Sequence, residues 1–118
     1  MLLAAGSDGL TIDDLNPVWL KTPVAPIVGS LMEKAPIDVE KILAAFQILQ
    51  RDVEYVVVEG TGRWLAPIQS DYFVSDLAAA MKLPVLVVAQ NRLGCLNHAA
   101  LTVRKVAAYE LRCVSLAA

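Results

Sequence analysis

From residue 38 onward the sequence alternates between two hydrophobic patterns, and this alternation constrains the fold more than any other feature. Asp38 is a good helix N-cap, and the residues after it place apolar side chains at helical spacing as far as Arg51-Asp52. Short runs of β-forming residues then predict strands, and the stretches between them predict helices. The expected elements are a helix at 38–52, strands at 55–58, 85–89 and 111–116, and helices at 73–82 and 95–109.

This order predicts the fold class. Strands that alternate with helices of about 10 to 15 residues imply a parallel sheet joined by right-handed crossovers. The strands at 55–58 and 85–89 are apolar throughout, which favours burial on both faces. The sequence therefore predicts an α/β fold, a parallel sheet with helices on both faces. Its 118 residues, 57% of them hydrophobic, fit one domain over residues 1–118.

The first 37 residues carry weaker signals. Asp13-Asp14 after Thr11 is typical of a helix start. Residues 25–34 are predicted to form a short helix with Pro26 in its first turn, and Pro36 ends it.

Charge and hydropathy exclude several functional classes. Ten Lys and Arg residues against twelve Asp and Glu give a net charge of -2, and the basic residues are scattered, so no nucleic-acid footprint is expected. The longest strongly apolar stretch, 83–89, is far shorter than the ~20 residues that span a bilayer. The start has no basic segment typical of a signal peptide. Cys95 and Cys113 are expected to be reduced thiols, and the protein is expected to be cytoplasmic.

In an open parallel sheet ligands bind at the carboxyl ends of the strands, and two predicted loops, 59–69 and 90–94, leave those ends. Glu59 closes the first strand, where a buried carboxylate is costly without a partner such as Mg²⁺. Gly60 and Gly62 would let the backbone approach a phosphate closely. The alternative is a tight turn in which Glu59 pairs with a Lys or Arg.

The second loop ends at Gly94, directly before a helix. A helix N-terminus offers free N–H groups and the positive end of the dipole, so it favours an anion. Asn97 and His98 fall in the first turn. For Asn97 the alternative to anion binding is capping of the helix, and for His98 it is a place on the surface. Cys95 is expected to serve in packing.

Taken together, the two loops resemble the dethiobiotin synthase family. Residues 56–68, V-V-V-E-G-T-G-R-W-L-A-P-I, are similar to the family's V-E-G-A-G-G-W signature with its following proline. Residues 92–99, R-L-G-C-L-N-H-A, are similar to its second signature, R/K-L-G-C-I/L-N-H-A. Prolines at 17, 23, 26 and 36 also match, so the resemblance covers nearly the whole chain.

The resemblance implies a homodimeric P-loop enzyme that uses ATP and Mg²⁺ to join CO₂ to 7,8-diaminopelargonic acid. It implies that Glu59 coordinates Mg²⁺ and that Gly60, Thr61 and Gly62 line the phosphates. It also implies that Gly94, Leu96 and Asn97 meet the substrate's carboxylate, in an active site shared with the other subunit.

The sequence also departs from the family. No G-x-x-x-x-G-K-S/T loop occurs in these 118 residues. Arg63 replaces a usual glycine, Thr61 a usual alanine, and Ile27 stands where histidine is frequent. The expectation is an incomplete P-loop NTPase-like, Rossmann-like domain, lacking the N-terminal P-loop and the C-terminal end and inactive alone. The alternatives are a non-catalytic interaction module that binds a full-length synthase, and a chain that works with a separate P-loop chain.

Overall fold

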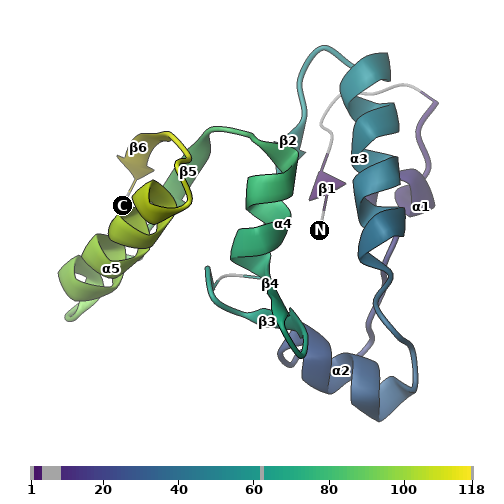
Figure 1. Ribbon diagram of the computed structural model, residues 1–118, viewed down its shortest axis with the longest axis horizontal. Coiled ribbons are helices and arrows are strands. Elements are labelled where there is room, and N and C mark those ends of the chain that lie inside the picture. The colour runs from purple at the N-terminus through teal and green to yellow at the C-terminus, as the bar shows by residue number, and fades with distance from the viewer. Residues whose placement is uncertain (1, 4–8, 62, 118) are drawn as a thin grey trace. The chain divides into compact units, whose positions relative to one another are not determined.

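In a computed structural model the chain divides into two compact units, Met1–Leu77 and Ala78–Ala118 (Figure 1). The structure describes residues 2–3, 9–61 and 63–117. A single domain over residues 1–118 stays a prediction.

The N-terminal unit contains most of the elements. They are β1 (Leu2–Leu3), α1 (Ile12–Leu15), α2 (Pro26–Glu33), α3 (Val39–Asp52), β2 (Val57–Val58), β3 (Pro67–Gln69) and β4 (Tyr72–Phe73). Helix α4 (Val74–Met81) begins in this unit and ends in the next. The C-terminal unit then contains β5 (Val85–Val88), α5 (Cys95–Ala108) and β6 (Cys113–Ala117).

Local capping explains where the first helices begin. The Thr11 hydroxyl accepts the Asp14 N–H at 3.3 Å, and the Asp14 carboxylate accepts the Thr11 N–H at 2.8 Å, which is a capping box. At α3 the Asp38 carboxylate accepts the Lys41 N–H at 3.0 Å. Both predicted helix starts are confirmed, as is the short helix that begins at Pro26.

The strand after α3 differs from the prediction. It is shorter, Val57–Val58, and it pairs antiparallel with β1, with Leu2 opposite Val58. Val57 is 66% exposed, so the expected burial of this strand on both faces is wrong here. The physical reason is that an apolar run predicts a strand but does not specify its partner, and the Leu2–Leu3 segment, which carried no predicted strand, supplies one.

A hairpin lies in what the sequence presented as a loop. Strands β3 and β4 pair antiparallel, with Pro67 opposite Phe73, and Ser70 and Asp71 connect them. The hairpin packs beside α2 through β3. The Gln69 side-chain amide also donates to the carbonyl of Ile37 at 2.9 Å, which fixes the hairpin to the chain after α2.

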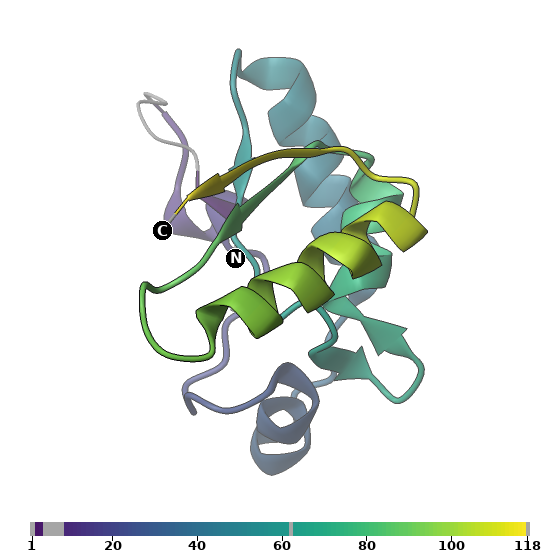
Figure 2. The ribbon, with the colours of Figure 1, turned by 90° about the vertical axis from the view of Figure 1, so that its left-hand side faces the viewer.

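In the C-terminal unit β5, α5 and β6 form the predicted parallel crossover. Val85 pairs with Cys113 and Leu86 with Ser115, and α5 lies alongside both strands (Figure 2). The α/β class is therefore confirmed. Within this unit Val87, Ala99 and Val106 are buried, whereas Leu86 and Val88 on the strand's other face are exposed. Across the described residues no helix is both long and apolar enough to cross a membrane.

Candidate functional site

The first predicted site loop leaves β2 directly, with Glu59 following Val58. Glu59 and Gly60 are exposed. The expectation that Glu59 would be buried at a strand end is therefore wrong, because its strand lies in a two-stranded sheet that leaves this end open. An exposed carboxylate keeps its hydration, so it needs no pairing cation to offset a burial cost.

The backbone after this loop is held against the start of α4. The Arg63 carbonyl accepts the Ala66 N–H at 3.2 Å, which closes a turn. The Trp64 and Ala66 carbonyls accept the N–H groups of Ser75 and Val74, each at 3.0 Å. A Cβ added at Gly60 would lie 3.3 Å from Val74 Cγ1, so the loop also approaches α4 at that position. Gly62 lies outside the described residues.

A cavity of about 420 Å³ opens beside this loop. It is lined on one side by Thr61, Arg63 and Ala66 and on the other by the segment Pro23–Ala25. Among the described residues of this lining Arg63 is the one that carries a charge, and it is exposed, as are Thr61 and Pro23–Ala25. Volumes of this size lie at the lower end of the range for small-molecule sites, about 300–1,000 Å³.

The opposite wall of the cavity is anchored on α2. The Glu33 carboxylate accepts the Thr22 N–H at 2.8 Å, and the Ala25 carbonyl accepts the Gly29 N–H at 3.0 Å. The N–H groups of Thr22 and Lys21, helped by the Lys21 charge, hold the pKa of Glu33 below its ordinary value. These bonds tie both ends of the exposed segment Pro23–Ala25 to α2.

The second predicted loop ends at Gly94, whose φ of 91° lies in the left-handed region. Gly94 is the N-cap of α5, and no side chain caps this end. Leu96 and Asn97 in the first turn are both exposed, Leu96 by 83%. The helix therefore presents uncapped N–H groups at its N-terminus, the arrangement that favours an anion.

The two loops lie in different units, Glu59–Thr61 in the first and Gly94–Asn97 in the second. The prediction that they meet at one edge of a sheet stays a prediction. Among the described residues no group of three or more His, Cys, Asp or Glu side chains gathers as a metal centre would require. A single carboxylate such as that of Glu59 is compatible with Mg²⁺, because this ion uses one or two protein carboxylates and otherwise takes water and phosphate oxygens.

Comparison with known proteins shows the family. A family model described as an AAA domain matches residues 4–117, nearly the whole chain. The chain belongs to this AAA domain family. The P-loop NTPase-like assignment made from the two motifs is thereby confirmed.

Individual relatives of this AAA domain chain carry a more specific name. It is 42% identical over 116 residues to the ATP-dependent dethiobiotin synthetase BioD of Akkermansia muciniphila, which covers 98% of this chain and 54% of the relative. The synthetase of the same name from Aromatoleum aromaticum is 45% identical over 107 residues, 91% of this chain and 48% of the relative. That from Methanococcus vannielii is 40% identical over 93 residues, covering 79% and 44%. The predicted resemblance is confirmed, and the chain spans about half the length of these relatives.

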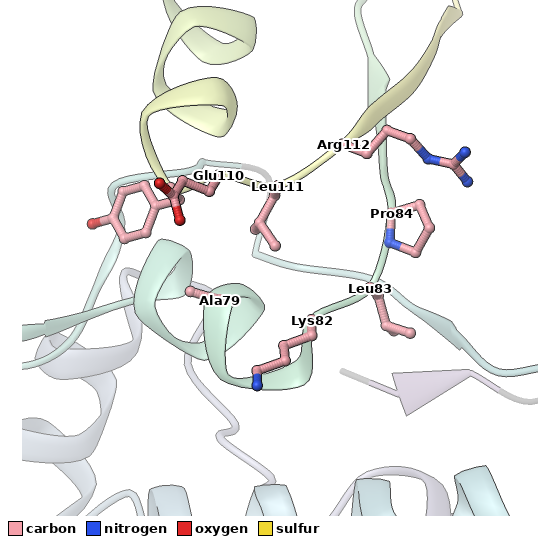
Figure 3. Close-up of a pocket in the computed structure, with 8 residues that line it drawn as sticks. Ala79, Lys82, Leu83, Pro84, Glu110, Leu111 and Arg112 are labelled. Carbon is pink, nitrogen blue, oxygen red and sulfur yellow. The ribbon is translucent and has the colours of Figure 1, made fainter.

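A second cavity of the AAA domain chain, about 470 Å³, lies in the C-terminal unit where β5 and β6 begin (Figure 3). It is therefore at the opposite end of these strands from Gly94. Figure 3 shows the side chains of Lys82 and Arg112, which line it, pointing away from each other. Two cations that diverge do not converge on one anion, so this cavity adds nothing to the candidate site.

Sequence reasoning missed the cavity beside Thr61 and Arg63, because its wall comes from residues 23–25, far away along the chain. Arg63 had been singled out only as a departure from the glycine usual in the family. The signal for the nearby hairpin was present in Ser70-Asp71, two turn-forming residues between β-forming ones.

Proposed function

We propose that this chain is part of an ATP-dependent dethiobiotin synthetase. Such a synthetase makes dethiobiotin from 7,8-diaminopelargonic acid. CO₂ adds to one amine of this substrate to give a carbamate, and ATP phosphorylates the carbamate. The second amine then closes the ring with release of phosphate. The observation that carries the proposal is the 42% identity to a synthetase across 98% of the chain, which includes both motif loops.

The proposed roles follow the chemistry of each residue. Glu59 would hold Mg²⁺ through its exposed carboxylate, and Gly60, Thr61 and Gly62 would line the ATP phosphates. Mg²⁺, when bound, neutralises phosphate charge. Gly94, Leu96 and Asn97 would meet the substrate's carboxylate at the uncapped N-terminus of α5, where N–H groups and the helix dipole favour an anion.

We also propose a homodimer in the cytoplasm, as the resemblance implies. A second candidate function is an interaction module that binds a full-length synthase or a separate P-loop chain. The observation that favours it is the exposed apolar face of β5, where Leu86 is 55% and Val88 73% exposed. Apolar side chains left open on a strand favour packing against another chain.

The test is a chimera in which residues 9–117 replace the corresponding segment of the Akkermansia muciniphila relative, assayed for fixation of labelled bicarbonate into dethiobiotin. Activity that requires ATP, Mg²⁺ and diaminopelargonate supports the proposal. Glu59→Gln is expected to reduce the rate about 100-fold, the size of effect typical of a lost charge-stabilising group. Asn97→Ala is expected mainly to raise KM for diaminopelargonate.

The unmodified relative and the isolated 118-residue chain serve as controls. A folded chimera that binds neither ATP nor diaminopelargonate would overturn the proposal. If that chimera still associates tightly with the intact relative, the interaction module is the better description.

A further inference from the structure

Glu59 and Arg63 carry opposite charges on the first site loop, and they do not pair with each other. Within the described ranges the one ion pair is Arg51 with Asp52. Glu59 therefore forms no ion pair with a described Lys or Arg, which was the alternative to a ligand-binding role. Both Glu59 and Arg63 are exposed, so each charge is accessible to a ligand of the opposite sign.

Arg63 lines the same hollow as Thr61. The two residues face the cavity of about 420 Å³ across from Pro23–Ala25. A ligand group that binds along Thr61 therefore also meets the Arg63 side chain. Because Thr61 and Arg63 are exposed, the charged oxygens of such a ligand that contact no protein group can keep their water and avoid a burial cost.

The backbone around these two residues is held close to α4. Before them, a Cβ added at Gly60 would lie 3.3 Å from Val74 Cγ1. After them, the Arg63 carbonyl accepts the Ala66 N–H at 3.2 Å, and the Ala66 carbonyl accepts the Val74 N–H at 3.0 Å. A loop backbone that is already ordered loses less conformational entropy when a ligand binds to it.

The magnesium complex of ATP presents both charges that this loop complements. Mg²⁺ takes one or two protein carboxylates and otherwise binds phosphate and water oxygens. The phosphate oxygens that do not bind the ion keep negative charge, and a guanidinium offers N–H donors in a planar fork that fits two of them. The glycine that is usual in the family at position 63 offers no such donors.

We propose that Arg63 contacts the ATP phosphates bound along Thr61 and adds a cation that the family's usual glycine does not supply. This inference rests on the proposed function and deepens its phosphate site, and it leaves the diaminopelargonate carboxylate at the start of α5. Arg63 is then a nucleotide-binding residue. Because the contact is exposed, water and salt screen it and its contribution to affinity is modest.

The first experiment measures binding of magnesium ATP to the chimera that carries residues 9–117, by calorimetry from about 50 to about 300 mM KCl. Arg63→Gly is expected to raise the Kd about fivefold at low salt, near the upper end for an exposed ion pair, and the difference should shrink as salt rises. Arg63→Lys should retain part of the affinity, because it keeps the charge and loses the planar fork.

Two controls make the result specific. Lys41→Gln removes an equal charge from an exposed residue of α3 that does not line the hollow, and is expected to leave the Kd unchanged. Adenosine, which has no phosphate, should bind equally to the Arg63→Gly variant and the unaltered chimera. Magnesium ATP that binds to Arg63→Gly as tightly as to the chimera, or more tightly because arginine crowds the phosphates, would overturn the proposal. Equal weakening of adenosine would also overturn it, because the effect would then not depend on phosphate.

Formation of dethiobiotin separates this inference from the proposed function. An active chimera whose Kd for magnesium ATP does not depend on Arg63 would refute the contact and leave the synthetase proposal standing. A chimera that binds magnesium ATP through Arg63 and forms no dethiobiotin would do the reverse. If Arg63→Gly raises only the KM for diaminopelargonate, Arg63 acts on the other substrate and the proposed phosphate contact is wrong.

Discussion

Among the residues that the structure describes, three that are not glycine adopt the left-handed conformation, each at the end of a helix. They are Lys34, Lys82 and Glu110, with φ of 50°, 54° and 57°. At α5 the Glu110 N–H donates to the Ala107 carbonyl at 2.9 Å, and the Leu111 N–H donates to the Val106 carbonyl at 3.3 Å. These bonds satisfy carbonyls in the last turn of the helix, and their free energy offsets the backbone strain at Glu110.

Replacing Glu110 with glycine is expected to stabilise the protein. The left-handed conformation costs an L-residue roughly 1–2 kcal/mol, and glycine avoids this cost. About 0.5–1 kcal/mol of the benefit is offset, because glycine has more conformational entropy in the unfolded chain. Glu110→Gly should therefore raise the free energy of unfolding by about 0.5–1 kcal/mol in urea titration. Ala100→Gly, inside the same helix, is the matched control and should lower it by about 1 kcal/mol. Destabilisation by both variants would contradict this account.

Gly94 is the opposite case, because the backbone conformation at this position favours glycine. Its φ is 91°, and no atom lies within 4 Å of a Cβ built there, so Gly94→Ala would meet strain without a steric clash. We expect a loss of about 1–2 kcal/mol in the free energy of unfolding. Gly60→Ala is the comparison, since Gly60 has no positive φ and its Cβ would only press Val74 at 3.3 Å. Equal losses in the two variants would refute the conformational explanation.

The sequence identified individual site residues better than their surroundings. The motif at Gly94 predicted a helix N-terminus, and the structure confirms one there. The predicted burial of Glu59 was wrong. Burial depends on which segments cover a strand, and the residue types within the strand do not specify those segments. Arg63 was visible in the sequence, but the cavity that it lines depends on a segment 38 or more residues earlier, Pro23–Ala25.

At the scale of elements, Glu33 joins helix α2 to the segment before it. Thr22 and Lys21 lower the pKa of Glu33 from its ordinary value of 4.5, so the folded state favours the charged form. The resulting stabilisation is complete above the unfolded pKa and is lost as pH falls through the lower, folded pKa.

This linkage predicts a pH-dependent difference between the protein and its Glu33→Gln variant. The free energy of unfolding should be higher in the unaltered protein at about pH 6, and the difference should shrink as pH falls toward about 3. Urea titrations across that range measure it. Glu40→Gln removes an equal charge from an exposed position on α3 and controls for general electrostatics. A difference that stays constant with pH would show that Glu33 acts through packing alone.

Elements with strong local signals were predicted within a few residues. α3 combines an Asp38 cap with a helical apolar stripe, and β5, α5 and β6 follow one another as the alternating pattern predicted. The misses were short. β1 and the β3–β4 hairpin each rest on strands of two or three residues, whose formation depends on the partner strand more than on their own sequence.

At the scale of the whole molecule, the apolar strands carry more hydrophobic surface than the described residues cover. Leu86 and Val88 on β5 and Val57 on β2 are all more than half exposed. Exposed strands with apolar side chains pair readily with other chains. The same property that predicted a parallel sheet buried on both faces therefore predicts association wherever one face stays open.

The 118-residue chain is accordingly expected to associate with itself, with a mass by light scattering that rises with concentration. Leu86→Lys places a charge on the exposed face of β5 and should raise the apparent dissociation constant roughly tenfold. The reason is that burying a leucine side chain on association contributes at least the free energy of a tenfold change in that constant. Ile48→Lys is the matched control, because Ile48 is 52% exposed on helix α3 against 55% for Leu86. If Ile48→Lys dissociates the chain as well as Leu86→Lys does, association is driven by general hydrophobicity and not by the strand. A monomer at every concentration would show that the open face of β5 does not pair at all.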